Sequence, residues 1–296
     1  MTAELLDGAA IARQVYSRLR QRVSALKELG VQPGLAAVML GDDPASKIYV
    51  RNKVQACMEV GVYSEVHAFG NDCSESTLLA TIDGINRNQR IHGAIVQMPL
   101  PPRLDAKRIL QTIARDKDVD GFSWHNLGAL LAGCPQFVPC TPLGVMTMLD
   151  HAGVAIEGST AVVIGRSVNV GKPVALLLID RGATVTVCHS KTRDLARHTV
   201  AADILVAAAG RARLVTADMV KPGAVVIDIG INRLPDGKLA GDVDFAGVSE
   251  KASYLTPVPG GVGRMTVAML IANTIAAAEH LAAVDSIGSK SGMTEK

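Results

Sequence analysis

The sequence has few aromatic residues. Phenylalanine, tryptophan and tyrosine together make up 3% of its 296 residues, whereas the hydrophobic class as a whole makes up 48%. The core must therefore be built from alanine, valine, leucine and isoleucine, which together with 28 glycines suit a parallel sheet covered by close-packed helices. The chain is long for a single core, and two α/β domains are expected.

Cysteine is also scarce, and its spacing has no pattern. The number of cysteines is odd, and no C-x-x-C spacing occurs, which argues against a disulfide framework and against a zinc site. We expect no bound metal. The five cysteines are predicted to be reduced, buried thiols: Cys57, Cys73, Cys134, Cys140 and Cys188.

The sequence has no large excess of positive or negative charge. The chain has 30 basic and 28 acidic residues and no dense basic run, which argues against a nucleic-acid partner but leaves room for a small anionic ligand. The N-terminus carries no basic region followed by an apolar block, so no signal peptide is expected. The longest apolar stretch, Val267 to Ala278, is shorter than the ~20 residues that cross a bilayer. We expect a soluble, cytoplasmic protein with no membrane partner.

Strands and helices alternate along the chain, which is typical of βαβ units around a parallel sheet. In residues 1–141, the first predicted domain, apolar runs predict strands over 34–40, 62–68 and 93–98. Helical spacing or caps predict helices over 9–29 and 44–61, from Ser74 through Asn86, and from Asp105. The turn-rich segment 134–142 is predicted to connect the two domains.

The second domain, residues 142–263, is predicted to have a Rossmann-type fold. A helix over 142–152, capped by Thr141, precedes the predicted strands 161–164, 184–188, 204–208 and 225–229. A last helix, residues 264–284, is expected to pack back onto the first domain. The tail, residues 285–296, has no apolar pattern and is predicted to be disordered.

A glycine turn in the second domain is a candidate dinucleotide site. In A-V-V-I-G-R-S-V-N-V-G-K-P, residues 161–173, a strand enters the turn and a helix follows, so free N–H groups and a helix N-terminus can hold phosphate. Gly165 permits the tight turn, and Gly171 permits a close approach. The spacing G-x-S-x-x-x-G differs from G-x-G-x-x-G, and a purely structural βα turn is the alternative.

The residues after the next strand indicate which dinucleotide binds. An NAD enzyme usually places a carboxylate there, for the ribose 2′-hydroxyl. This chain has Ser190, Lys191 and Arg193 at that place, with Arg166 in the first turn. Cations and a hydroxyl suit a 2′-phosphate, so NADP is favoured. The alternative for Lys191 and Arg193 is a solvated loop.

Candidate catalytic residues lie in the first domain. Tyr49 and Lys53 are four residues apart on a predicted helix and so share one face, with Ser46 nearly on it. A tyrosine and a lysine together can serve acid/base chemistry, although such pairs are also common on exposed helices. Gln97 ends an apolar strand at the edge where α/β sheets place functional groups, and its amide needs a partner.

An acidic loop, D-V-D-G, adds two more candidates, Asp118 and Asp120. A simple turn is one alternative. A calcium-like loop is another, but the further acidic ligands that such a loop needs are missing.

Eight segments in this order resemble the methylenetetrahydrofolate dehydrogenase/cyclohydrolase family. They run from about residue 34 to residue 275, and their order makes the resemblance specific. The segments are GDDPASKIYVRNK, HGAIVQMPLP, KDVDGF, PCTPLG, GRSVNVGKP, CHSKT, GDVDF and TPVPGGVG.

The resemblance implies roles for the candidates of the first domain. Lys53 would be the central catalytic lysine, Tyr49 would pack against the folate, and Gln97 would orient Lys53 and assist the cyclohydrolase step. Asp120 would hold the pterin through its N–H groups, and Ser46 would support the same pocket.

The resemblance also implies residues that bind the cofactor and substrate in the second domain. NADP would be held by Gly165, Arg166, Ser167, Gly171, Ser190 and Ile231. The loop 256–263, with Pro257, Gly260 and Gly261, would border the ligands in an interdomain cleft. The family relationship further implies a homodimer.

The implied substrates are tetrahydrofolate derivatives. The enzyme would oxidise 5,10-methylenetetrahydrofolate with NADP to the 5,10-methenyl cation, and water would convert this cation to 10-formyltetrahydrofolate. Two positions depart from the family pattern: Arg264 stands where proline is usual, and Met98 where leucine is common. Compared with proline, arginine at this position does not fix the backbone for the first turn of the last helix. It also adds a positive charge near the positive end of that helix.

Two other functions remain possible at this point. A different NADP-dependent Rossmann dehydrogenase would explain residues 161–230 but not Tyr49, Lys53, Gln97 and Asp120. A non-catalytic folate or nucleotide sensor would bind ligands without turnover, and the presence of Lys53 argues against it.

Overall fold

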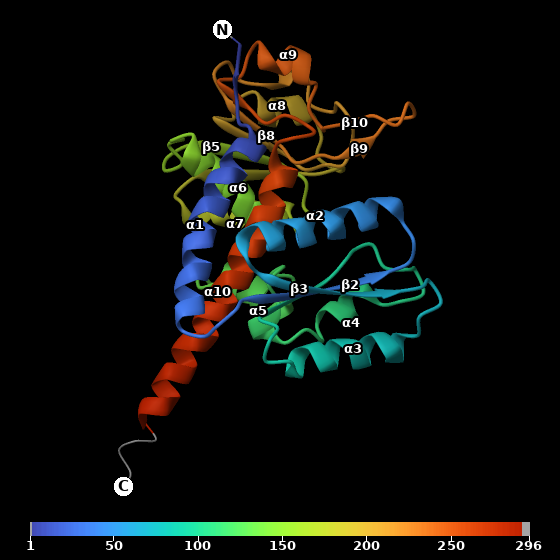
Figure 1. Ribbon diagram of the computed structural model, residues 1–296. Coiled ribbons are helices and arrows are strands. Elements are labelled where there is room, and N and C mark those ends of the chain that lie inside the picture. The colour runs from blue at the N-terminus through green and yellow to red at the C-terminus, as the bar shows by residue number, and fades with distance from the viewer. Residues whose placement is uncertain (1, 292–296) are drawn as a thin grey trace. The chain divides into compact units, whose positions relative to one another are not determined.

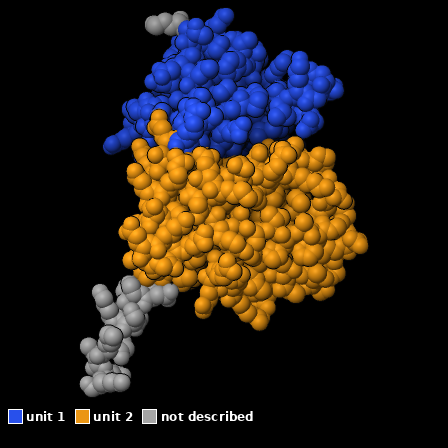
Figure 2. Space-filling view, in the orientation of Figure 1, with its two compact units in different colours: residues 1–13, 139–266 blue, residues 14–138, 267–296 orange. Residues whose placement is uncertain are grey.

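The computed structural model of the chain describes residues 2–291 (Figure 1). The chain divides into two compact units, which Figure 2 distinguishes by colour. Unit 1 comprises Met1–Arg13 and Pro139–Thr266, and unit 2 comprises Gln14–Val138 and Val267–Lys296. Each unit holds a parallel sheet with helices, so the predicted two-domain α/β class is confirmed.

Unit 2 is built on a three-stranded parallel sheet in the order β3-β2-β4. In Figure 1, α2 lies on one side of β2 and β3, and α3 and α4 lie on the other. The elements are α1 (Gly8–Glu28), β2 (Gly34–Leu40), α2 (Pro44–Val60), β3 (Tyr63–Phe69), α3 (Glu75–Arg87), β4 (Gly93–Val96), α4 (Ala106–Leu110), a 3₁₀ turn (Arg115–Lys117), α5 (Trp124–Leu131) and α10 (Val262–Ser291).

Strand β2 is buried along its whole length because both faces of the sheet are covered. Ala36, Val38 and Leu40 join a core with Leu78 and Ile82 of α3. The core of unit 2 is thus built from aliphatic side chains, as the low aromatic content predicted.

Helix α2 has caps at both ends, and it carries three of the candidate residues. Pro44 is its first residue, and the side chain of Asp43 accepts from the N–H of Ser46 at 2.8 Å. The helix ends at Gly61, whose φ of 89° is left-handed and whose N–H donates to Cys57 O at 2.9 Å.

Unit 1 contains a six-stranded parallel sheet in the order β1-β11-β8-β7-β5-β6. Its elements are β1 (Glu4–Leu5), α6 (Cys140–His151), β5 (Thr160–Ile164), α7 (Gly171–Asp180), β6 (Thr184–Cys188), α8 (Leu195–Thr199), β7 (Ile204–Ala207), a 3₁₀ turn (Ala217–Met219), β8 (Val225–Asp228), an antiparallel pair β9 (Asn232–Arg233) and β10 (Leu239–Ala240), α9 (Phe245–Ser249) and β11 (Tyr254–Leu255).

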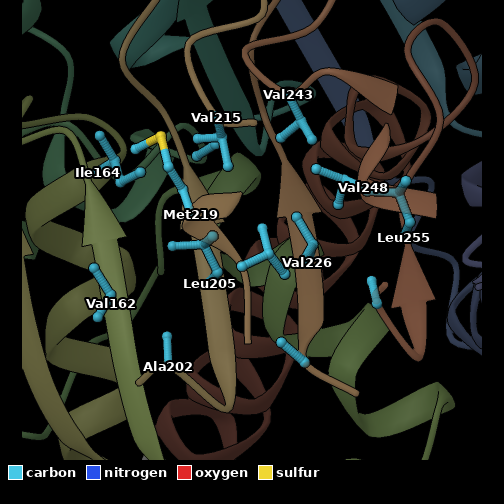
Figure 3. Packing of buried hydrophobic residues seen from close by; sticks show 14 of the residues in the cluster. Val162, Ile164, Ala202, Leu205, Val215, Met219, Val226, Val243, Val248 and Leu255 are labelled. Carbon is cyan, nitrogen blue, oxygen red and sulfur yellow. The ribbon is translucent and has the colours of Figure 1, made fainter. Parts of the chain in front are cut away.

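One strand after another contributes a side chain to the core of unit 1 (Figure 3). Val162, Leu205, Val226 and Leu255 come from β5, β7, β8 and β11, and all are essentially buried. The chain runs from β5 out to β6 and then returns past β5 to β7. The order of connections therefore reverses between β5 and β7, which is where such sheets bind ligands.

The N-terminus departs from the predicted domain boundary. Residues 1–13 group with unit 1, because β1 pairs with β11 through Glu4 and Tyr254. Gly8 also packs against the loop before α10, and a Cβ at this glycine would lie 2.0 Å from Gly261 O. Strand β1 has only two residues, which is too short for a periodic pattern, so the sequence showed no sign of it.

Two further predictions about helix ends were wrong. Helix α6 begins at Cys140, with Pro139 at the cap position, and Thr141 instead contacts Thr266 through their hydroxyl oxygens at 2.9 Å. Helix α10 continues through Ser291, so residues 285–291 are helical where disorder was expected. Extending an existing helix costs little, even without an apolar pattern. The rest of the predicted tail, residues 292–296, lies outside the described residues.

Helix α10 is longer than its apolar stretch suggested. Within residues 2–291, this is one helix whose length and composition would suffice to cross a membrane, over Val262–Ala283. However, 56% of that window is buried inside the protein, as in the core helix of a soluble protein. Asn273 within it donates to Val119 O at 2.8 Å and to Val138 O at 3.0 Å.

Candidate functional site

The structure brings Lys53 and Gln97 into direct contact in unit 2. Lys53 Nζ donates to Gln97 Oε1 at 3.1 Å. Gln97 follows β4 at the carboxyl edge of the sheet, and its backbone N–H donates to Val38 O at 2.8 Å. Its side-chain Nε2 donates to Met98 O at 2.8 Å, so the amide is held with its oxygen towards the lysine.

Tyr49 and Ser46 precede Lys53 on the same helix. Tyr49 lies one turn before Lys53, and 39% of its surface is exposed, which is high for an aromatic residue inside a soluble unit. Ser46 is 5% exposed, and its N–H is taken up by the cap at Asp43. The exposed ring of Tyr49 beside the half-buried Lys53 is therefore free to pack against a ligand.

Asp120 lies on a loop that Asp118 organises. Asp118 is buried, and its carboxylate accepts from Phe122 N at 3.2 Å, Ser123 N at 2.7 Å and Asn126 Nδ2 at 2.8 Å. Asp118 also forms a parallel bridge with Ala94 of β4, so the loop runs alongside the strand that ends at Gln97. Sequence reasoning named both acids, but the resemblance assigned a role to Asp120 alone.

A cavity of about 250 Å³ opens at this edge of the sheet of unit 2. The segments that follow β2, β3 and β4 all line it, including Asp43, Asn71 and Leu100. A larger hollow of about 450 Å³ lies at the opposite edge, where the strands begin, and none of the candidate residues lines either cavity. The carboxyl edge is the better candidate for chemistry because Gln97 follows β4 there and contacts Lys53.

In unit 1, the turn after β5 leaves no room for a side chain at either of its two glycines. A Cβ on Gly165, whose φ is 130°, would lie 2.2 Å from Ala208 O. A Cβ on Gly171 would lie 2.2 Å from Gly165 O. Gly171 is the first residue of α7, so the turn and the helix N-terminus form the cradle that a dinucleotide phosphate requires.

The polar residues predicted to bind NADP lie in this turn or follow the neighbouring strand β6. Arg166, Ser167 and Ser190 are exposed, as are Lys191 and Arg193, and no carboxylate occupies the positions just after β6. Ser167 also has a structural task, because its Oγ accepts from Gly171 N at 3.3 Å. Ile231, after β8, is 48% exposed and available for a ring contact. These donors fit a 2′-phosphate.

The predicted loop 256–263 belongs to unit 1 and not to the unit that holds Lys53. Within it, Gly260 has a φ of 113°, and Gly261 N donates to Pro257 O at 2.8 Å. Arg264 is exposed in the first turn of α10, and its N–H donates to Gly261 O at 3.1 Å. Proline at this position would lack that N–H.

Two residues at the edge of unit 1 escaped the sequence reasoning. Asp228 is the last residue of β8, Asp242 follows β10, and both carboxylates are buried. The only signal was the segment G-D-V-D-F, which carried the resemblance but had no role attached.

Models of two domain families match the chain. "Tetrahydrofolate dehydrogenase/cyclohydrolase, catalytic domain" matches residues 6–120, and "Tetrahydrofolate dehydrogenase/cyclohydrolase, NAD(P)-binding domain" matches residues 139–282. The bifunctional protein FolD of Nitrosospira multiformis is 56% identical over 95% of this chain and 97% of the relative. That of Paraburkholderia xenovorans is 57% identical over 96% of this chain and 100% of the relative.

Solved structures agree with these matches. The FolD methylenetetrahydrofolate dehydrogenase/cyclohydrolase of Campylobacter jejuni has a TM-score of 0.92 and 46% identity, over 94% of this chain and 99% of that one. The enzyme of Trypanosoma brucei, solved with NADP and an inhibitor, has a TM-score of 0.91 and 37% identity, over 95% and 98%. The chain belongs to the tetrahydrofolate dehydrogenase/cyclohydrolase family, as an enzyme with both a catalytic and an NAD(P)-binding domain.

Proposed function

We propose that the protein oxidises 5,10-methylenetetrahydrofolate with NADP and hydrolyses the resulting 5,10-methenyl cation to 10-formyltetrahydrofolate. The observation that carries this proposal is the 3.1 Å contact between Lys53 Nζ and Gln97 Oε1, with the exposed Tyr49 one turn away. The family to which the chain belongs takes its name from tetrahydrofolate, which supports a folate substrate.

Lys53 and Gln97 act as a unit in this mechanism. Gln97 is held by Met98 O, so its oxygen fixes the direction of the lysine amine. An ammonium group has three donors, and one bond to Gln97 leaves others for substrate and water. Lys53 is thus placed to move the proton that hydrolysis of the methenyl cation requires.

Other residues of unit 2 bind the folate. Asp120 accepts from the amino and ring N–H groups of the pterin, because an ionised carboxylate is an acceptor only. Tyr49 packs its ring against the flat substrate, and Ser46 supports the same pocket from the first turn of α2.

In unit 1, the glycine turn binds the dinucleotide. Bound NADP supplies the acceptor for the hydride of the bridging carbon. Gly165 and Gly171 allow the backbone to approach the phosphates, and Ser167 holds the turn closed. Arg166 and Ser190 bind the 2′-phosphate, and Ile231 lies against a ring. Pro257, Gly260 and Gly261 border the ligands. Positioning, more than acid/base power, governs the hydride step.

Replacing Lys53 by methionine tests this division of labour. The variant keeps an unbranched side chain but loses the amine, so cyclohydrolase activity should fall at least about 100-fold. The dehydrogenase should be impaired less, because it depends on positioning. Both activities are measured spectrophotometrically in the same preparation, with NADP and NAD in parallel.

Lys107→Met is the matched control, because Lys107 is an exposed lysine of α4 in the same unit. It should leave both activities unchanged. Equal retention of both activities in Lys53→Met would contradict the proposed role. Ligand binding without any absorbance change in the unmodified protein would indicate a sensor instead. The cytoplasmic location and the homodimer stay predictions.

A further inference from the structure

Asp242 is a fully buried carboxylate that collects backbone donors from one loop. Its exposed fraction is 0%. Its Oδ2 accepts from Ala209 N at 2.6 Å and from Gly210 N at 2.9 Å. Its Oδ1 accepts from Arg211 N at 2.8 Å and from Asn232 Nδ2 at 2.9 Å. Three consecutive N–H groups thus converge on one side chain.

The loop that Asp242 holds follows β7 at the point where the connections of the sheet reverse. Ala208 N donates to Ile164 O at 2.7 Å, so the end of β7 lies directly beside the end of β5. The carbonyl of Ala208 is also the group that leaves no room for a Cβ at Gly165. The loop 208–211 therefore forms one wall of the cradle for the dinucleotide.

A second buried carboxylate fixes the backbone of Asp242 itself. Asp228, at the end of β8, accepts from Asp242 N at 2.9 Å, from Val243 N at 3.0 Å and from Gly230 N at 2.9 Å. Gly241 has no room for a side chain, since its Cβ would lie 1.8 Å from Asp228 Oδ2. The start of the segment G-D-V-D-F is thus tied to the end of β8, and the loop 209–211 is tied to Asp242 in turn.

We propose that Asp242 is a positioning residue for the dinucleotide, because its carboxylate ties the loop 209–211 after β7 to the segment after β10 and so shapes the wall of the NADP cradle. This inference rests on the proposed function of unit 1. Asp242 does not touch the cofactor in this proposal. It acts through the backbone N–H groups of Ala209, Gly210 and Arg211, whose positions its carboxylate fixes.

Comparing the two activities distinguishes a positioning role of Asp242 from a merely structural one. Hydrolysis of the methenyl cation uses Lys53 and Gln97 of unit 2 and consumes no dinucleotide. A general loss of stability lowers both activities together. A misplaced loop at the cradle should instead raise the Michaelis constant for NADP and leave hydrolysis unchanged.

Asp242→Asn is the test variant, because an amide has the same shape but only one acceptor oxygen. Its NH₂ group would face backbone N–H donors, so one or two of the loop contacts are lost. We expect the Michaelis constant for NADP to rise about tenfold or more, since hydrogen bonds to a charged acceptor are the strong ones. The cyclohydrolase rate should stay within about twofold of the unmodified enzyme.

Asp203→Asn is the matched control. Asp203 also accepts from a backbone N–H, that of Thr160 at 2.9 Å, and it pairs with Lys221, but it precedes β7 at the other edge of the same sheet. Its replacement should leave both activities and the NADP constant unchanged. If the NADP constants of the two variants change equally, the proposal for Asp242 is overturned.

Asn232→Ala provides a milder variant should Asp242→Asn fail to fold. It removes one donor to Asp242 and leaves the backbone contacts, so a rise of about threefold in the NADP constant is expected. An unchanged constant in this variant would then overturn the proposal.

Gly165→Ala separates this inference from the proposed function. The added methyl group would collide with Ala208 O and should abolish NADP binding, measured by calorimetry. If it does not, the cofactor site itself is misassigned. If Gly165→Ala abolishes binding while Asp242→Asn binds NADP normally, the site stands and the inference about Asp242 is wrong.

Discussion

At the scale of the residue, burial changes the chemistry of single ionisable groups. Asp228 is 4% exposed, and burial raises its carboxyl pKa to about 6. The backbone N–H groups of Asp242, Val243 and Gly230 oppose this rise, and the nearby carboxylate of Asp242 adds to it. Cys57 behaves similarly, since burial raises the pKa of its thiol to about 12.

The raised pKa of Asp228 predicts how the stability of the protein depends on pH. The folded protein binds this proton more tightly than the unfolded chain, so the contribution of Asp228 to stability is present below pH 4 and is lost as the pH rises through about 6. Asp228→Asn cannot titrate. Between pH 4 and pH 7 the free energy of unfolding of the unmodified protein should therefore fall by about 3 kcal/mol relative to that of the variant. Urea denaturation at several pH values measures this, and a constant difference between the two proteins would contradict it.

Residue types were predicted better than their surroundings. Lys53, Gln97 and Tyr49 were candidates by residue type and position, the resemblance supplied their predicted roles, and the structure brings Lys53 and Gln97 together. Cys134, in contrast, is exposed and Cys73 is partly exposed, although all cysteines were expected to be buried. Burial of a single side chain depends on what packs over it, and residues distant in the sequence decide that.

At the scale of the element, helices with local start signals were predicted closely. The helix predicted from Ser74 through Asn86 is α3, Glu75–Arg87, and the hydroxyl of Ser74 accepts from Thr77 N at 3.1 Å. Strand β2 covers the predicted residues 34–40. Caps and apolar runs are properties of neighbouring residues, so the sequence displays them directly.

The cap of α3 predicts the effect of a single substitution. Ser74→Ala removes the acceptor for Thr77 N and should lower the free energy of unfolding by about 1 kcal/mol. Both enzymatic activities should be unchanged at a temperature where the variant is folded, since Ser74 lies outside the candidate site. Chemical denaturation measures the loss, and Ser74→Asp, which restores an acceptor, should recover most of it. No loss in Ser74→Ala would show that the cap contributes nothing.

Short elements were missed or misplaced. The two-residue strands β1 and β11 exist through pairing with distant strands, as Glu4 pairs with Tyr254, whereas β9 and β10 pair only with each other. The cap predicted at Thr141 failed because Thr141 faces Thr266, a residue of α10. For β1, β11 and Thr141, a tertiary contact outweighed the local signal.

At the scale of the whole molecule, the family relationship implies a homodimer. Light scattering after size-exclusion chromatography should then give a mass of twice 31.0 kDa. The melting temperature should rise with protein concentration, because dilution favours dissociation. A mass of one chain at micromolar concentration, with a melting temperature independent of concentration, would rule the homodimer out.

The sequence by itself determined the fold class, the family and the residues with suitable chemistry, because these depend on composition, on local periodicity and on the order of short motifs. Only the tertiary structure decided which carboxylates join the loop after β7 to the segments after β8 and β10. Asp242 bonds to N–H groups 31 to 33 residues away, and Asp228 bonds to N–H groups 14 and 15 residues away. Such contacts form only after the parallel strands have assembled, so no local sequence pattern can predict them.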